Sequence, residues 1–241
     1  MMAQDEAGMR SVDRFLSRAR RAGREMLTEP ETKRMLAFAG IAIPTEAVAT
    51  SAAHAARLAS RIGFPVVLKV VSRDLPHKSD VGGVQLGLHS QEAVRRAYNT
   101  IIARVRRASR RARIDGVLVQ PHLSGREVIV GATQDAQLGP VVVFGLGGTA
   151  VELLGDVAFR LVPINSRDAK EMLGEVKSAP LLGAYRGQTA VNTRSIVDAL
   201  LSLSRLMSRF SHVIREIEIN PLLVTSRGAV AVDAMAVLAS R

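Results

Sequence analysis

The stretch FPVVLKVVSRDLPHKSDVGGVQLGL, residues 64–88, decides the fold of this chain. Its first part is apolar and rich in β-branched residues, which predicts a buried strand interrupted only by Lys69. The pair Gly82–Gly83 predicts a turn, and GVQLGL predicts a second strand directly after it. Between the strands lies the polar segment RDLPHKSD, so an imidazole and a lysine stand at the mouth of a glycine turn.

Helix and strand patterns alternate on both sides of this stretch. Ser51 is a predicted N-cap of the helix AAHAARLASRIG, and Ser90 is a predicted N-cap of an arginine-rich helix. Three further segments have helical periodicity: EPETKRMLAFAG, SRDAKEMLGEV and TRSIVDALLSLSRLMSRF. Further strands are predicted at IPTEAVAT, DGVLVQPHL, REVIVGATQD, GPVVVFGLGG, DVAFRLVPI, HVIREIEINPLLVT and AVAVDAMAVL. This alternation predicts an α/β protein, with a hinge at residues 121–125 where strand character breaks.

The composition excludes several classes of protein. Hydrophobic residues make up 47% of the 241 residues and aromatic residues only 3%, so the core must be built from Ala, Val, Leu and Ile. There is no cysteine, which excludes disulfides and thiolate metal sites. No apolar run approaches the roughly 20 residues that span a bilayer, and no signal-peptide core is present. We therefore expect a cytoplasmic protein with no membrane partner.

The net charge of +11 comes from two arginine clusters. Residues 1–24 hold six arginines against three acids, and residues 95–113 hold eight arginines and no acid. The second cluster has an apolar stripe at helical spacing, so most of its arginines are predicted on a solvated face. With no Trp and two Tyr, the chain lacks the stacking residues typical of nucleic-acid binding, which is therefore not expected. A basic rim that attracts nucleotide or coenzyme phosphates is a second interpretation.

Lys69 and the glycine pair form the first candidate site. A lysine in an apolar strand either extends to water at a sheet edge or is held in a cleft that faces an anion. Gly82 and Gly83 permit positive φ and bring backbone N–H groups close to a ligand, as in phosphate-binding loops. The alternative is an ordinary hairpin turn, which often contains paired glycines.

The segment EIEINPLLV, residues 216–224, is the second candidate site. Alternate residues of a strand share a face, so Glu216, Glu218 and Asn220 point one way and the isoleucines between them the other. Carboxylate and amide oxygens are ligands suited to Mg²⁺. The turn SRG brings Asp233 back towards the same end. Exposed polar positions on a half-buried strand are the alternative interpretation, and a stronger one for Glu216 than for the others.

The segment VQPHLSGREVIVG is the third candidate site. Gln120, at the end of a strand before the hinge, is placed to bind a flat base. Glu127 stands alone among apolar neighbours and is a candidate acceptor for ribose hydroxyls.

In order along the chain, LPHKSDVGGV, VLVQPHLSGREVIVGATQD, GPVVVFGLGGTAVELLGDVAFRLVP, AYRG and EIEINPL…AVAVD resemble the ATP-grasp β subunits of ADP-forming acyl-CoA synthetases, relatives of succinyl-CoA synthetase β chains. The resemblance covers about residues 28–238. It implies an ATP-grasp fold in which two α+β lobes clasp Mg·ATP. The implied division is an arginine-rich extension (1–27), a first lobe with the glycine loop (28–122) and a second lobe with the metal-binding strands (123–241).

The resemblance also implies roles for individual residues. Lys69 would bind α- and β-phosphate oxygens, with Gln120 and Glu127 at the base and ribose. The implied metal ligands are Asn220 and Asp233, with Glu218 as a neighbouring candidate. Arg160, in DVAFR, would neutralise the γ-phosphate.

His77, in the motif HKSD, would relay a phosphoryl group between ATP or ADP and a histidine of a partner subunit. A neutral imidazole is a nucleophile at pH 7, and Lys78 with the N–H groups of Gly82 and Gly83 would offset the charge of the moving group. Asp80 is a candidate to orient the ring.

The chain has no G-x-G-x-x-G opening of a CoA-binding lobe, so the resemblance implies a CoA-binding α subunit, in an αβ or α₂β₂ assembly. The alternative function is a non-catalytic or degenerate ATP-grasp domain that senses nucleotides or acts as a scaffold. Two departures bear on it, since Met235 stands where the family often has an arginine and Asn192 where it usually has an acid.

Overall fold

The computed structural model describes residues 2–75, 77–147, 155–185, 187 and 189–239. The chain divides into two compact units, named here unit 1 (residues 1–43 and 124–241) and unit 2 (residues 44–123). The helices are α1 (Met2–Arg21), α2 (Glu29–Phe38), α3 (Ala52–Ile62), α4 (Gln91–Ala108), α6 (Ser166–Glu175) and α7 (Thr193–Phe210), with a 3₁₀ turn η1 (Ala179–Leu182). None of these helices is long and apolar enough to cross a membrane.

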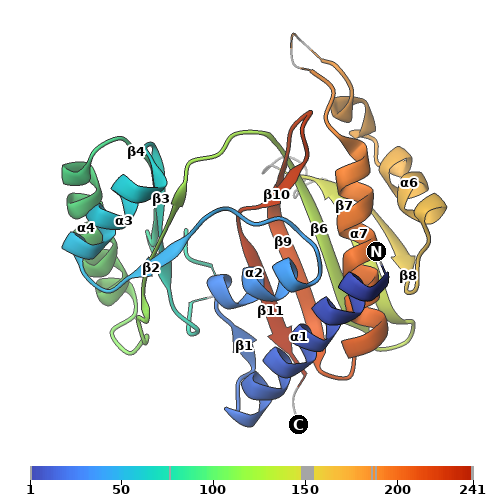
Figure 1. Ribbon diagram of the computed structural model, residues 1–241, viewed down its shortest axis with the longest axis horizontal. Helices are drawn as coiled ribbons and strands as arrows, with labels where there is room; N and C mark the ends of the chain where they lie inside the picture. The colour runs from blue at the N-terminus through green and yellow to red at the C-terminus, as the bar shows by residue number, and fades with distance from the viewer. Residues whose placement is uncertain (1, 76, 148–154, 186, 188, 240–241) are drawn as a thin grey trace. The chain divides into compact units, whose positions relative to one another are not determined.

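The strands of unit 2 are β2 (Ala47–Ala49), β3 (Val66–Val71), β4 (Val84–Leu88) and β5 (Gly116–Pro121). They form an antiparallel sheet in the order β2-β5-β3-β4, and α3 and α4 pack on it (Figure 1). Both predicted caps are confirmed, because the hydroxyls of Ser51 and Ser90 each accept a hydrogen bond from the N–H group three residues on, at 3.2 Å. Alternate residues of β3, such as Leu68 and Val70, are buried against these helices.

The strands of unit 1 are β1 (Met26–Leu27), β6 (Arg126–Asp135), β7 (Gly139–Leu146), β8 (Val157–Leu161), β9 (Ile214–Val224), β10 (Ala229–Ala231) and β11 (Ala234–Leu238). Their order is β1-β11-β9-β6-β7-β8, and β10 pairs with β9 beside this path. Helices α2, α6 and α7 pack on one face of the sheet (Figure 1). The register places Ile217, Ala132 and Val142 in one buried row on that face.

The first 43 residues correct the predicted division of the chain. Residues 1–27 are not an extension, because α1 buries Met9 and Leu16, among others, in the core of unit 1. Residues 28–43 do not join the first lobe either, since α2 packs on β11, and β1 pairs with β11 through Met26 and Val237. The reason is long-range strand pairing, which no local pattern reveals. The junction between the units after residue 123 falls inside the predicted hinge.

Candidate functional site

Lys69 and Gln120 lie on the same face of the unit 2 sheet. Lys69 pairs with Leu118 of β5, and Gln120 follows two residues later on the same strand, opposite Val67. Cross-strand partners share a face, so both polar side chains point away from α3 and α4, roughly 7–8 Å apart along the diagonal. They are only 6% and 2% exposed. Because β3 lies between β5 and β4, Lys69 is not at a sheet edge and does not extend to water there.

The loop between β3 and β4 corrects one part of the predicted phosphate site. Gly82 has the expected positive φ of 66°, but its N–H group donates to the carbonyl of Ser79 at 3.0 Å. The N–H group of Gly83 donates to the carbonyl of Lys78 at 2.8 Å. Both amides therefore close the loop on itself and are not directed at a ligand. Gly83 is needed for another reason, since a Cβ there would lie 2.6 Å from Cγ1 of Val70.

His77 is exposed at the start of this loop, and Pro76 before it lies outside the described residues. The structure gives no hydrogen bond between the described His77 and Asp80, so the predicted orientation of the ring by Asp80 has no support. Lys78 is half-buried two positions away from Asp80. The loop thus presents an accessible imidazole beside a cationic residue.

Glu218, Asn220 and Asp233 come together in unit 1 as the sequence predicted. Glu218 and Asn220 are half-buried on β9, and Ile219 between them is fully buried in the core of unit 1. The side-chain amide of Asn220 donates to Oε1 of Glu218 at 3.0 Å, and its backbone N–H donates to the carbonyl of Asp233 at 3.1 Å. The predicted strand AVAVDAMAVL is divided into β10 and β11, and Asp233 lies at the break between them.

The donor set of this corner fits a hard cation. No cluster of three or more His, Cys, Asp or Glu side chains occurs among the described residues, so carboxylates alone do not form a metal site there. Two carboxylates and an amide oxygen are nevertheless a suitable set for Mg²⁺, which keeps several waters when it binds. The amide nitrogen of Asn220 donates to Glu218, and an amide oxygen is among the ligands that Mg²⁺ accepts.

A buried ion pair on α2, which the sequence did not reveal, contacts the backbone next to Asp233. Nζ of Lys33 lies 2.8 Å from Oε1 of Glu29, and the two side chains are 0% and 3% exposed. Nζ also donates to the carbonyl of Val232, the residue before Asp233, at 3.2 Å. The available signal was a lysine and a glutamate spaced i, i+4 on the buried stripe of α2.

Arg160 is not brought to this corner. It pairs across the sheet with Val142, whose row continues through Ala132 to Ile217, on the helix-covered face. Glu218 lies on the opposite face. The guanidinium of Arg160 instead forms a bidentate ion pair with Glu175 of α6, which raises the pKa of Arg160 and lowers that of Glu175.

Glu127, the predicted ribose residue, is exposed at the start of β6, opposite Leu223. Its backbone carbonyl accepts a hydrogen bond from Gly147 at 2.8 Å. The predicted glycine turn after β7 continues into residues 148–154, which lie outside the described residues, as does Arg186 of the AYRG motif.

The fold and the two polar clusters define an ATP-grasp domain, and the model of the ATP-grasp domain family matches residues 18–238. The chain belongs to this family. It is 41% identical over 213 residues to the β subunit of acetate–CoA ligase [ADP-forming] I from Pyrococcus furiosus, covering 88% of this chain and 91% of that one. It is 42% identical over 217 residues to acetate–CoA ligase [ADP-forming] II from Archaeoglobus fulgidus, but these are 90% of this chain and only 31% of that protein.

Solved structures agree with this membership. An acetyl-coenzyme A synthetase 1 from Ca. Korarchaeum cryptofilum, in complex with coenzyme A and Ca-AMPCP, superposes with a TM-score of 0.90 at 42% identity, over 93% of this chain and 98% of that one. The same synthetase with coenzyme A and Mg-AMPPCP has a phosphohistidine segment that points towards its nucleotide-binding site, with a TM-score of 0.81 at 38% identity over 95% of this chain and 100% of that one.

Proposed function

We propose that this chain is the nucleotide-binding β subunit of an ADP-forming acyl-CoA ligase, with acetate as the acid, as in the relatives described above. The reaction is acyl-CoA + ADP + phosphate ⇌ acid + ATP + CoA. The observation that carries the proposal is the buried pair Lys69 and Gln120 on one face of an interior strand pair. A lysine ammonium is suited to bind phosphate oxygens, and the family supplies them as the phosphates of a nucleotide.

The nucleotide contacts are proposed residue by residue. Lys69 binds phosphate oxygens, Gln120 the base and Glu127 the ribose. Lys78 places positive charge beside the moving phosphoryl group, whereas Gly82 and Gly83 shape the loop that carries it. No contact between Arg160 and the γ-phosphate is proposed, because Arg160 lies on the helix-covered face, opposite Glu218, and is paired with Glu175.

Glu218, Asn220 and Asp233 are the proposed ligands of Mg²⁺. When bound there, the cation neutralises phosphate charge and aligns the transferred group. The chain's own contribution is to fix the three oxygen donors, through the bond from Asn220 to Glu218 and the backbone bond from Asn220 to Asp233.

His77 is the proposed relay residue. In the direction of ATP synthesis, a ring nitrogen of neutral His77 attacks the phosphorus of a phosphohistidine on the partner subunit, and that N–P bond breaks. A β-phosphate oxygen of ADP then attacks the phosphorus on His77, whose N–P bond breaks to leave ATP and a neutral imidazole. The exposure of His77 suits a group that must meet two reactants in turn.

The partner is proposed to be a CoA-binding α subunit, in an αβ or α₂β₂ assembly. The support is the relative from Pyrococcus furiosus, which is named a β subunit and is matched over 91% of its length.

The test is calorimetric titration of Mg·ADP into the chain, alone and with its partner, and into a Lys69→Met variant. Lys177→Met, an exposed lysine outside the candidate site, is the matched control. We expect binding that needs Mg²⁺, weakens about tenfold or more in Lys69→Met and is unchanged in the control. His77→Asn should bind nucleotide normally yet abolish turnover. Nucleotide binding without phosphate transfer, even with the partner, would establish the nucleotide-sensing alternative.

A further inference from the structure

The N-terminal arginine cluster takes part in none of the roles proposed above, although it is held firmly in unit 1. Helix α1 packs on α2, and its residues Val12, Leu16 and Ala19 are no more than 4% exposed. Gly23, with a φ of 65°, then turns the chain back towards β1 and α2. The arginines on the other face of α1 therefore have defined positions and do not belong to a loose tail.

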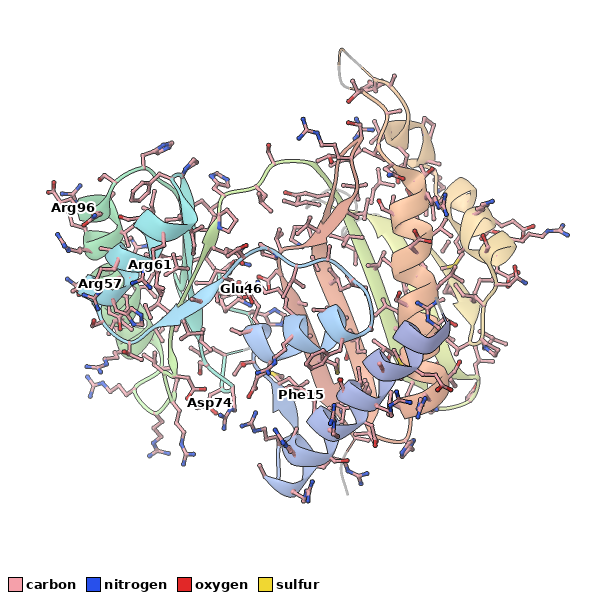
Figure 2. The ribbon with its side chains drawn as sticks, in the orientation of Figure 1. Phe15, Glu46, Arg57, Arg61, Asp74 and Arg96 are labelled. Atoms are coloured by element: carbon pink, nitrogen blue, oxygen red, sulfur yellow. The ribbon has the colours of Figure 1, made fainter. Side chains whose placement is uncertain are left out.

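A pocket of about 370 Å³ lies between α1, α2 and the segment that joins them. Four arginines line it and only one acid, Glu31, so its net charge is +3. The volume is within the range of about 300–1,000 Å³ that is typical of small-molecule sites. Phe15 of α1, labelled in Figure 2, and Phe38 of α2 supply an apolar wall.

The single acid of the pocket is already engaged. One carboxylate oxygen of Glu31 forms an ion pair with Arg24. The other accepts hydrogen bonds from the backbone N–H and the hydroxyl of Thr28, at 3.0 and 2.9 Å. Burial raises the pKa of Glu31, but these hydrogen bonds outweigh it and hold the pKa below its ordinary value. The carboxylate of Glu31 thus caps α2 through Thr28 and neutralises one arginine, Arg24.

The other three arginines have no acid within ion-pair distance among the described residues. Arg14 reaches only the hydroxyl of Ser11, at 3.4 Å, and the guanidinium of Arg34 lies 5.8 Å from the centre of the Phe38 ring. Arg18 has neither kind of contact. A sphere of this volume is roughly 9 Å across, close to the screening length of about 8 Å at physiological ionic strength, so these charges repel one another and are only partly screened.

One donor of the pocket is also unsatisfied. Nε of Arg24 is buried and has no hydrogen-bond acceptor among the described residues. A buried donor without an acceptor is unfavourable. An oxyanion bound among the arginines would relieve their repulsion, since a guanidinium binds phosphate and carboxylate through two parallel hydrogen bonds.

We propose that this pocket binds a small organic oxyanion, a phosphate or carboxylate attached to a flat apolar group. The charged end lies among Arg14, Arg18 and Arg24, and the apolar end lies against Phe15. This site is built entirely from residues 11–38. It shares none of the residues assigned above to nucleotide, metal or phosphoryl relay.

The probes are phenyl phosphate, benzoate and inorganic phosphate, each titrated calorimetrically into the full chain. Phenyl phosphate and benzoate distinguish the two oxyanions, and inorganic phosphate lacks the apolar group. The test variant is Arg14→Glu/Arg18→Glu. The control is Arg10→Glu/Arg21→Glu, which makes the same charge change on the same helix outside the pocket. Thermal unfolding of each variant establishes that it is folded.

We expect at least one aromatic anion to bind with a Kd of about 1 mM or tighter, and to weaken about tenfold or more in the test variant. Binding should persist in the control and fall as salt is raised. Phe15→Leu should weaken the aromatic anions but not inorganic phosphate. Equal losses in test and control variants, no binding of any probe, or binding lost only in Lys69→Met would overturn the proposal.

Discussion

Replacing Lys33 by methionine tests whether the buried ion pair Lys33–Glu29 of α2 supports the proposed Mg²⁺ site at Glu218, Asn220 and Asp233. The substitution keeps most of the side-chain volume but leaves the carboxylate of Glu29, 3% exposed, without its cation. It also removes the donor to the carbonyl of Val232. Removing one partner of a buried pair typically costs about 3–5 kcal/mol. At roughly 2–4 °C per kcal/mol for a chain of this length, the melting temperature should fall by roughly 6–20 °C.

Two further variants separate the stability cost of an unpaired buried charge from the effect of Lys33 on the position of Asp233. Arg96→Met on α4 breaks an exposed ion pair of the same i, i+4 spacing, 67% and 76% exposed (Figure 2), and should cost only about 0.5 kcal/mol or less. The double variant Lys33→Met/Glu29→Leu removes both charges and should recover much of the lost stability. It does not restore the bond to the carbonyl of Val232, so Mg²⁺-dependent nucleotide binding should stay weakened.

Stability is measured by calorimetric or circular-dichroism melting, and Mg²⁺ dependence by titration of nucleotide at several Mg²⁺ concentrations. A melting temperature of Lys33→Met equal to that of Arg96→Met would refute the energetic argument. Full recovery of Mg²⁺ dependence in the double variant would refute the positioning argument, because stability alone would then explain the loss.

Three other outcomes follow from the described contacts. Gly83→Ala should destabilise the chain by about 1–3 kcal/mol in urea unfolding, since the new Cβ would lie 2.6 Å from Cγ1 of Val70. The control is Gly174→Ala in α6, where a Cβ meets nothing within 4 Å; this variant should be neutral or stabilising. Asn192→Ala should lower the melting temperature by removing the N-cap of α7, a loss of about 1 kcal/mol that Asn192→Asp should not cause. Glu31→Gln should destabilise at pH 7: the lowered pKa of Glu31 gives stability that is present above its ordinary value of 4.5 and is lost as pH falls through the folded-state pKa. The difference in melting temperature from the unsubstituted chain should therefore shrink in acid, and a constant difference would contradict this.

Local sequence patterns determined most elements of this fold. Side-chain caps at Ser51 and Ser90 fixed the starts of two helices, and Gly63, with a φ of 97°, fixed the end of the first. The sequence also predicted that Glu218 and Asn220 share one face of β9, because a strand places alternate residues on opposite faces whatever its partners are. The approach of Asp233 to Asn220 was also predictable, since a short turn returns the chain alongside β9.

Other features depended on local hydrogen bonds that residue type alone does not specify. Asn192 departs from the acid usual in the family, yet it caps α7 by accepting from the N–H of Ser195 at 3.2 Å. The N–H groups of Gly82 and Gly83 looked available for phosphate, but their use depends on how the loop closes, which composition does not specify. A glycine pair is compatible both with N–H groups that bind phosphate and with N–H groups that close the loop.

The sequence by itself determined the approximate positions of most strands and helices, although not of α1, and which residues alternate along the strands, because those properties depend on neighbours within a few positions. Only the tertiary structure decided that residues 1–43 belong to unit 1, that Arg160 faces Glu175 on the helix-covered side, and that Lys33 supports the residue before Asp233. Strand order and register set these relations. They are fixed by hydrophobic burial and hydrogen bonding summed over the whole sheet, between residues as far apart as Glu25 and Leu238.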